Sequence, residues 1–474
     1  MSKQFSEYLR STLPLLEQLI ETLKNRYAYC SILGVDSNGK SISVGSHNIN
    51  VGENSFAERG FVVRVHNGKN YAEYSFNDIN KNNIKNIVDE IEDELLLNAR
   101  YKKSKYIELE QYKLFNEEKI KKDFSRVYEG EELDAKDIVT NLTEIKNQLA
   151  AKDFVINASA SFQQLDISKV FISNKKHLTQ FYTWAAGSVV AVVSKDDDIR
   201  YSYSSTSGVE PNAIFDGLKK ITDKTYQDAM SLINAEAPKS GVYDIIACPD
   251  ITGLIAHEAF GHGVEMDMFV KGRSKGANYV GKRVASDLVT MHEGAKGEKL
   301  EVASYFFDDE GVLAHDTIEI KNGILQTGVS DAISALVLGT EPTGNGKRES
   351  FERKVYTRMT NTYFEGGTNT LEEMIASIKH GFMIEVGYSG MEDPKNWGIQ
   401  CAALIGREIK NGKFTGKVCS PIMMTGYVPD LLCSISMLTT DIELFGSGAC
   451  GKGYKEWVKV SDGGPYLKAR VNIG

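Results

Sequence analysis

The chain has 474 residues, of which 42% are apolar and 25% charged, and this balance is typical of a folded globular protein rather than of a disordered one. Its length exceeds a single ordinary hydrophobic core and predicts two domains. The formal net charge of −9 provides no electrostatic basis for binding nucleic acid or an anionic membrane, so neither partner is expected.

The sequence carries no pattern of secretion or membrane insertion. Its first residues lack a basic start followed by an apolar core and a small-residue cleavage site, and no run approaches 18 apolar residues. The six cysteines are scattered without CxxC spacing, which is typical of reduced thiols rather than of a disulfide framework. We therefore expect a cytoplasmic protein.

Helical spacing of apolar residues begins close to the N-terminus. An opening helix is predicted over residues 13–23, with Ser11 as its N-cap and Pro14 in its first turn, where a missing N–H is tolerated. The same spacing predicts three further helices in the first half, over residues 84–95, 138–149 and 211–232. The charged residues 102–132 are expected to form a solvated excursion between two of these helices.

Strand patterns lie between the predicted helices. Residues 58–76 read as a hairpin that turns at Asn67-Gly68, a dipeptide favoured in two-residue turns. Residues 154–207 alternate between apolar and polar and predict an antiparallel meander. The first half is thus expected to be a mixed α/β domain with antiparallel strands.

A domain boundary is predicted where the sequence becomes small and polar, in NAEAPKSG at residues 234–241. We place one domain over residues 1–236 and the other over residues 237–474. The second is rich in strand signals, and two Asn-Gly turns at residues 322–323 and 411–412 read as hairpins of one curved sheet or barrel, packed against a helix over 371–379. The predicted fold class is α+β.

The motif HEAFGH at residues 257–262 places Glu258 directly after His257 and puts His262 five positions further on. Two imidazoles and an adjacent carboxylate supply two ligands and a proton acceptor for a catalytic zinc site. In an ideal helix, however, residues five apart lie about 140° from each other around the axis. The site therefore requires an inserted residue, a π-bulge, which we predict at Gly261; without it the two histidines would be neighbours by chance.

Spacing alone leaves the third metal ligand open. The candidates are Glu265, Asp308, Asp309 and a thiolate from the C-terminal half. Cys450 stands out among the thiols because GSGACGKGY surrounds it with glycines, which permit close backbone approach, and because nearby Lys452 favours a thiolate.

Four segments together resemble the TldD/PmbA family of metallopeptidases, whose members have also been described as modulators of DNA gyrase. These segments are HEAFGHGVEMD at 257–267, FFDDEG at 306–311, RMTNTYFEGG at 358–367 and ACGKG at 449–453. The resemblance extends over essentially the whole chain. It is to the catalytic, TldD-like branch, because this chain keeps the HExxxH motif that the TldE/PmbA-like branch lacks.

The resemblance implies a Zn²⁺ ion held by His257, His262 and Cys450, with Glu258 as general base. It also implies a two-domain subunit that forms a homodimer or a heterodimer with a TldE/PmbA-like subunit, and a substrate that is an extended peptide or unfolded protein. The strand-rich C-terminal domain, with its curved or barrel-like sheet, is expected to carry the metal site.

The expected reaction is hydrolysis of a peptide bond by metal-activated water, with Glu258 taking the proton and returning it to the leaving amine. Two other functions stay open: a non-catalytic scaffold or gyrase-modulating partner with a structural metal, and a zinc amidohydrolase acting on small amides. Candidates for substrate contact or for stabilising the oxyanion are Arg358, Asn361, Tyr363, Tyr427, His292 and His315.

Overall fold

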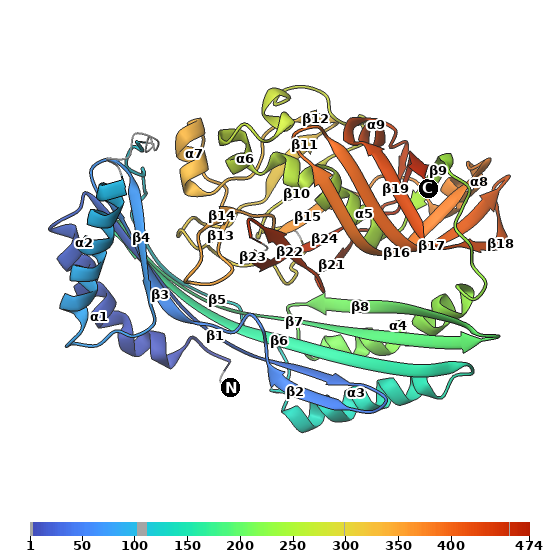
Figure 1. Ribbon diagram of the computed structural model, residues 1–474, viewed down its shortest axis with the longest axis horizontal. Helices are drawn as coiled ribbons and strands as arrows, with labels where there is room; N and C mark the ends of the chain where they lie inside the picture. Colours follow the sequence, from blue (N-terminus) through green and yellow to red (C-terminus); the bar gives the residue numbers. More distant parts are fainter. Residues whose placement is uncertain (1–2, 102–110, 298, 455) are drawn as a thin grey trace.

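A computed structural model describes residues 3–101, 111–297, 299–454 and 456–474. The first half of the chain forms one long, mainly antiparallel sheet with the central strand order β4-β3-β1-β6-β7-β5; β2 pairs with β1, and β8 with β7. The strands are β1 (Tyr29–Val44), β2 (Ile49–Glu53), β3 (Arg59–His66), β4 (Tyr71–Phe76), β5 (Ile120–Ser125), β6 (Val155–Ser173), β7 (Lys176–Lys195) and β8 (Asp198–Gly208). In Figure 1 this sheet curves beneath the second half of the chain.

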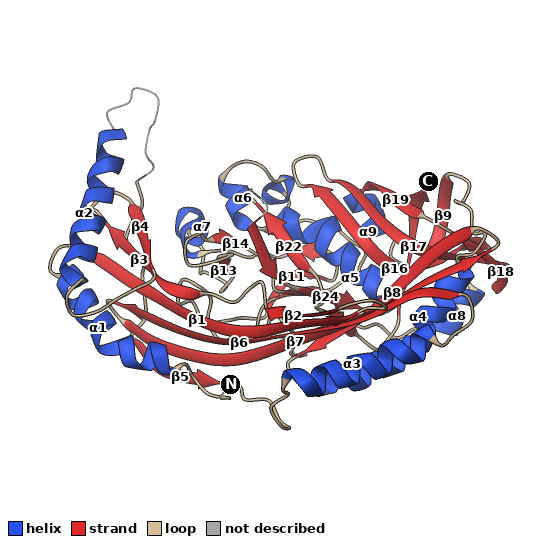
Figure 2. Ribbon diagram, turned by 60° about the horizontal axis from the view of Figure 1, so that its bottom comes forward, coloured by secondary structure: helices blue, strands red, loops and turns tan. Residues whose placement is uncertain are grey.

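Four helices cover the outer face of the long sheet, as Figure 2 shows. They are α1 (Glu7–Lys24), α2 (Ile84–Tyr101), α3 (Ala135–Ala150) and α4 (Ala213–Ser231). Successive side chains of a strand point to opposite faces. In β6, Phe162 accordingly packs among residues of α3 and α4, whereas Leu165 packs on the other face against residues from the second half of the chain. The sheet is therefore buried on both faces.

The structure confirms most of the elements predicted for the first half. Residues 155–208 form the antiparallel meander β6–β7–β8, and β3 and β4 form the hairpin that turns at Asn67-Gly68. The excursion predicted over residues 102–132 is wrong in part, because β5 pairs in parallel with β7, where Phe124 packs against an apolar cluster. Residues 102–110 of that segment lie outside the described residues.

The opening helix begins earlier in the chain than the sequence predicts. Helix α1 begins at Glu7, because the side chain of Ser6, not Ser11, accepts the N–H of Leu9 and caps the first turn. Pro14 consequently lies inside the helix rather than in its first turn. Burial of Leu9 adds one more residue to the apolar stripe that packs on the sheet.

The second half of the chain contains a closed five-stranded barrel. Its strands pair in the ring β16-β9-β25-β19-β17, which closes because β17 also pairs with β16. The strands are β9 (Gly241–Ala247), β16 (His380–Asp393), β17 (Gly398–Lys410), β19 (Ile422–Tyr427) and β25 (Leu467–Ile473), with β18 (Lys413–Cys419) and β20 (Met437–Leu438) attached. The predicted fold class, α+β with a barrel-like C-terminal sheet, is confirmed; the division between residues 236 and 237 stays a prediction.

A six-stranded sheet lies beside the barrel, in the order β12-β11-β10-β15-β24-β21. Its strands are β10 (Met291–Glu293), β11 (Thr317–Lys321), β12 (Ile324–Leu325), β15 (Asn361–Phe364), β21 (Glu443–Phe445) and β24 (Ser461–Gly464). The two Asn-Gly hairpins therefore belong to different sheets, not to one: the turn at 322–323 joins β11 to β12, and the turn at 411–412 joins β17 to β18. Local turn chemistry does not specify which sheet a hairpin joins.

Short elements complete the second half. The two small hairpins are β13 (Gly346–Lys347) with β14 (Tyr356–Thr357) and β22 (Ala449–Lys452) with β23 (Glu456–Lys459). The helices are α5 (Pro249–Ile255), α6 (Met266–Val270), α7 (Ala332–Leu338), α8 (Leu371–Ala376) and α9 (Val428–Cys433). Met374 of α8 packs against the barrel residue Ile409, as expected for this helix. Within the described ranges, no helix is long and apolar enough to cross a membrane.

Candidate metal centre

The histidine motif lies on a helix that changes its pitch. Helix α5 runs directly into a π-helical turn, η1 (Ala256–Gly261), and then into a 3-10 turn, η2 (His262–Val264). The backbone N–H of His262 bonds to the carbonyl of His257, five residues earlier. This wider turn brings residues five apart onto one side of the helix. The predicted distortion at Gly261 is confirmed, and a side chain there would clash with buried Met359.

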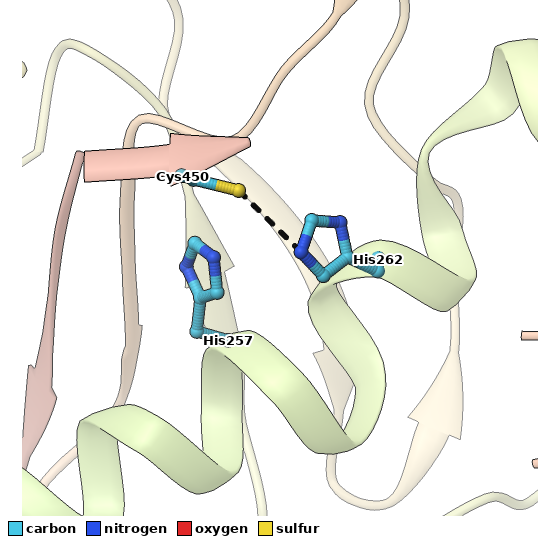
Figure 3. A group of neighbouring side chains, drawn as sticks. All are labelled: His257, His262 and Cys450. Carbon is cyan, nitrogen blue, oxygen red and sulfur yellow. Dashed lines mark hydrogen bonds between the residues drawn. The ribbon is translucent and has the colours of Figure 1, made fainter. Parts of the chain in front are cut away.

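The side chains of His257, His262 and Cys450 converge, as Figure 3 shows. One potential ligand atom from each lies within 4.8 Å of the other two, and Sγ of Cys450 is 3.4 Å from Nε2 of His262. Around tetrahedral zinc, bonds of about 2.3 Å to sulfur and about 2.0 Å to nitrogen place these atoms roughly 3.5 Å apart. The separation of Cys450 and His262 therefore matches that of two ligands of one zinc ion, and His257 lies close enough to be a third.

The electrostatics of the trio favour a thiolate. Burial alone would raise the pKa of Cys450, but His257 and His262 lower it well below its ordinary value. Burial disfavours the charged form of His257 as well, yet Cys450 raises its pKa to about 9. Since the thiolate is the form that binds metal ions, the sulfur is held ready as a ligand.

A second layer of residues orients His262. Oε2 of Glu265 lies 3.1 Å from Nδ1 of this ring, so Nδ1–H donates to the carboxylate and Nε2 faces Cys450. Lys452 donates to the same oxygen of Glu265 at 2.9 Å and to Asp267 at 2.7 Å. Burial opposes ionisation of Glu265, but Lys452 and His262 hold its pKa at about 2. Glu265 is thus a hydrogen-bond acceptor behind the trio and not one of the three converging ligands.

Cys450 is positioned by the hairpin β22–β23, which Arg358 holds from behind. The guanidinium of Arg358 is buried and donates to the carbonyl oxygens of Cys450, at 2.5 Å, and of Glu456, at 3.0 Å. Lys452, in the same hairpin, bonds to Glu265. These contacts fix the cysteine relative to the histidine helix.

Glu258 lies on the open side of the trio. Its Oε2 is 3.9 Å from Nε2 of His262, and its side chain lines a cavity. Gly390 of β16 makes room for it, because a side chain at that position would overlap Cγ of Glu258. This carboxylate therefore faces the space in which a substrate would meet the metal centre.

The cavity beside the trio has a volume of about 1010 Å³. It lies between the barrel strand β16, the segment from β21 to β22, and the edge strand β8 of the long sheet. Tyr203 and Ser205 of β8 line it opposite His257 and Cys450. A cavity of this size is large enough to hold a ligand.

Two acidic residues of this site were not singled out from the sequence. Glu392 of β16 lies against the backbone of Gly263, and both of its carboxylate oxygens are buried. Asp462 of β24 lines the cavity, and burial raises its pKa to about 7 although His257 lowers it. A lone Asp before two glycines, in VSDGG, was the available signal for Asp462; nothing in the sequence distinguished Glu392.

The other candidates from the sequence lie away from the cavity. Asp308 and Asp309 form turns with residues 310–312 and 346–348 and are not among the converging ligands. The remaining candidates do not line the cavity: they are Arg358, Asn361, Tyr363, Tyr427, His292 and His315. Asn361 donates to Gly294 and Ser304 within the protein, and Lys275 donates to the hydroxyl of Tyr427.

Comparisons with known proteins agree with this geometry. Residues 240–472 match the family model described as PmbA/TldA metallopeptidase C-terminal domain. A protein of Methanothermobacter thermautotrophicus named "Metalloprotease" is 29% identical over 324 residues, covering 68% of this chain and 70% of its own. The "Zinc metalloprotease TldD homolog" of Saccharolobus solfataricus is 24% identical over 415 residues, covering 87% of this chain and 89% of its own.

A solved structure extends the likeness to the whole fold. TldE from Thermococcus kodakarensis superimposes with a TM-score of 0.74 at 18% identity, covering 97% of this chain and 99% of its own. At this identity the likeness concerns the fold alone. The family model matches the half of the chain that carries HEAFGH and Cys450. The chain belongs to the TldD/PmbA family of metallopeptidases.

Proposed function

We propose that the protein is a zinc-dependent peptidase that hydrolyses extended or unfolded peptides, with His257, His262 and Cys450 as metal ligands and Glu258 as general base. The convergence of these three ligands beside a carboxylate, at the wall of a cavity, is the observation that carries the proposal. The name of the Saccharolobus solfataricus relative supports zinc as the metal.

A zinc ion held there would lower the pKa of a bound water molecule and polarise a peptide carbonyl. The protein's own residues prepare this chemistry. Nδ1–H of His262 donates to Glu265, which keeps Nε2 of that ring directed at the site. The burial of His257 and Cys450 keeps bulk water away from the ligand side of the centre.

Glu258 is placed to handle the proton. Its carboxylate faces the cavity and makes no hydrogen bond to another described residue, so it is free to accept a proton from water on Oε1 or Oε2. The same carboxyl group can then donate that proton to the nitrogen of the departing amine. A structural metal site would have no use for a carboxylate in this position.

The shape of the cavity supports an extended peptide as substrate. Strand β8, which lines one side, pairs with β7 alone among the described strands and so presents a free edge. A peptide can add to such an edge through backbone hydrogen bonds without a demand for one sequence. We expect an unfolded protein to be cleaved much faster than its folded form.

A solved structure named TldE shares the fold of this chain. We propose that the chain pairs either with a second copy of itself or with a TldE/PmbA-like subunit.

The decisive experiment is the substitution Glu258→Gln, which keeps the volume of the side chain and removes its charge. We expect zinc to be retained while hydrolysis of unfolded casein falls by about 10²-fold or more. Unchanged hydrolysis would refute the role of Glu258. Hydrolysis of small amides with no cleavage of unstructured peptides would instead identify a zinc amidohydrolase.

A further inference from the structure

The wall of the cavity carries an excess of negative charge. Six acidic residues line it: Asp250, Glu258, Glu385, Glu392, Glu443 and Asp462. Only two cationic side chains do so, Lys224 and Lys452, and both already bind carboxylates of the protein. Apart from the two histidines and the metal ion that the trio would hold, the described lining therefore has no unpaired cationic side chain to balance the remaining acids.

Two of these carboxylates lie diagonally across one strand pair. In the antiparallel ladder of β21 and β24, Phe445 lies opposite Asp462, and Glu443 lies opposite Gly464. Residues two apart in a strand share a face, so Glu443, Phe445 and Asp462 all point to the same side of the ladder. All three line the cavity, which identifies that side.

Neither carboxylate is paired within the protein. No hydrogen bond or ion pair joins the side chain of Asp462 or Glu443 to any residue of the described segments. Their position differs from that of Glu385, which is bound by Arg407 and Lys224. Asp462 is half-buried, whereas Glu443 is exposed at the rim of the cavity. An unpaired, half-buried carboxylate on a cavity wall is a favourable partner for a cation from outside the protein.

Asp462 is close to the reacting centre. A Cβ added to Gly253 would lie 2.7 Å from its Oδ1, which places the carboxylate against α5 one helical turn before His257. Its electrostatic neighbours are His257, Glu258, Asp250 and Cys450. A group bound to Asp462 therefore belongs to a substrate residue near the bond that is cut.

The aromatic ring opposite Asp462 indicates which cation fits. A lysine or arginine side chain has an apolar stem and a charged end, so it can pack its stem on Phe445 while its end reaches a carboxylate. An N-terminal ammonium group has no such stem. We propose that Asp462, Glu443 and Phe445 form a subsite for a lysine or arginine side chain of the peptide substrate. This specificity rests on the proposed peptidase function.

The test compares matched substrates with the zinc-loaded protein. One set is N-acetylated peptides in which lysine or the uncharged isostere norleucine occupies each position near the scissile bond in turn. We expect kcat/KM at one position to be at least about tenfold higher for lysine, and the ratio to shrink as salt is added. A third peptide, without lysine but with a free amino terminus, separates side-chain from terminal cations.

Two variants locate the effect. Asp462→Asn is expected to bring the lysine-to-norleucine ratio towards 1, with Glu443→Gln lowering it less. Asp441→Asn, which removes an exposed carboxylate two residues before Glu443 and outside the cavity, should leave the ratio as it is. Equal rates for lysine and norleucine peptides in the unaltered protein would overturn the proposal. A preference for the peptide with the free amino terminus would also overturn it. If Asp462→Asn lost zinc and cleaved both peptides equally more slowly, the proposal would fail as well, and Asp462 would be assigned to the support of His257.

A measurement of peptide binding tests the subsite separately from the proposed peptidase reaction. If no peptide is hydrolysed, the peptidase proposal fails, and the affinity of the zinc-loaded Glu258→Gln variant for the same peptides is measured by fluorescence anisotropy. Tighter binding of the lysine peptide, by about tenfold, supports the subsite even then. Equal affinities overturn it.

Discussion

The carboxylate of Glu265 lies 3.1 Å from Nδ1 of His262, on the side of the ring away from Cys450. Supporting acceptors of this kind set the orientation of a metal-binding histidine, and losing one typically weakens metal binding 10–100-fold. We predict that Glu265→Gln lowers the affinity for zinc within this range, because the neutral amide is a poorer acceptor and no longer pairs with Lys452.

Competition with a chelator of known affinity measures this effect. The matched control is Glu408→Gln, since Glu408 also bonds to a histidine, His380, but belongs neither to the trio nor to the lining of the cavity. Equal zinc affinity of the Glu265 variant and the unaltered protein would contradict the supporting role.

Substitution of Arg358 distinguishes a structural role of this residue from direct binding of substrate. Its guanidinium bridges the carbonyls of Cys450 and Glu456, and a lysine ammonium cannot reproduce that planar, two-pronged geometry. We predict that Arg358→Lys lowers zinc content and costs about 1–3 kcal/mol of unfolding free energy. The exposed Arg353→Lys should change neither. A raised KM with zinc and stability intact would instead support direct contact with substrate.

Gly253 allows α5 to approach β24 closely. A Cβ there would lie 2.5 Å from the backbone nitrogen of Gly463, which no side-chain rotation can relieve. We predict that Gly253→Ala lowers the free energy of unfolding by about 1–3 kcal/mol, as overpacking does, and disturbs His257 one turn later. Gly52→Ala, where an added Cβ meets nothing, is the control in a urea titration. Similar urea midpoints for Gly253→Ala and Gly52→Ala would show that α5 and β24 do not pack closely at Gly253.

Glu73 forms ion pairs with buried Arg64 in its own half of the chain and with buried Arg348 in the second half, and so joins the two halves. Burial raises the pKa of Glu73, but the two arginines overcome this and hold it at about 2. Because this folded-state pKa lies below the unfolded value of about 4.3, the ion pairs stabilise fully above that value and are lost as the pH falls towards 2.

We therefore predict that Glu73→Gln destabilises the protein by about 3 kcal/mol at neutral pH and that the difference shrinks on acidification. Unfolding by urea at several pH values tests this. Glu92→Gln, at the exposed pair with Arg26, should have little effect at any pH. A difference that grows on acidification would contradict the assigned pKa.

Local patterns predicted the features of this fold that depend on neighbours in sequence. The alternation over residues 154–207 gave the meander, and the five-residue interval in HEAFGH required the π-helical turn at Gly261. The start of α1 was misjudged because Ser6 and Ser11 are both acceptable caps, and only packing of Leu9 on the sheet decides between them.

Local sequence patterns do not predict features that depend on pairing between strands far apart in the chain. Both Asn-Gly turns have the same chemistry, so which sheet each hairpin joins follows from strands elsewhere in the chain. Asp462 and Glu443 share one face of a ladder only because β21 and β24 pair in one particular register. Cys450, 188 residues after His262, was singled out among several possible ligands by its glycine-rich surroundings and by the family resemblance.

The most direct test of the metal centre is the zinc content of Cys450→Ser beside that of Cys433→Ser, which removes an exposed thiol outside the trio. Elemental analysis of the purified, zinc-incubated proteins should find one zinc ion per chain in the unaltered protein and in Cys433→Ser, and much less in Cys450→Ser. Full zinc occupancy in Cys450→Ser would contradict the proposed ligand set and assign the third position to Glu265 or to an aspartate.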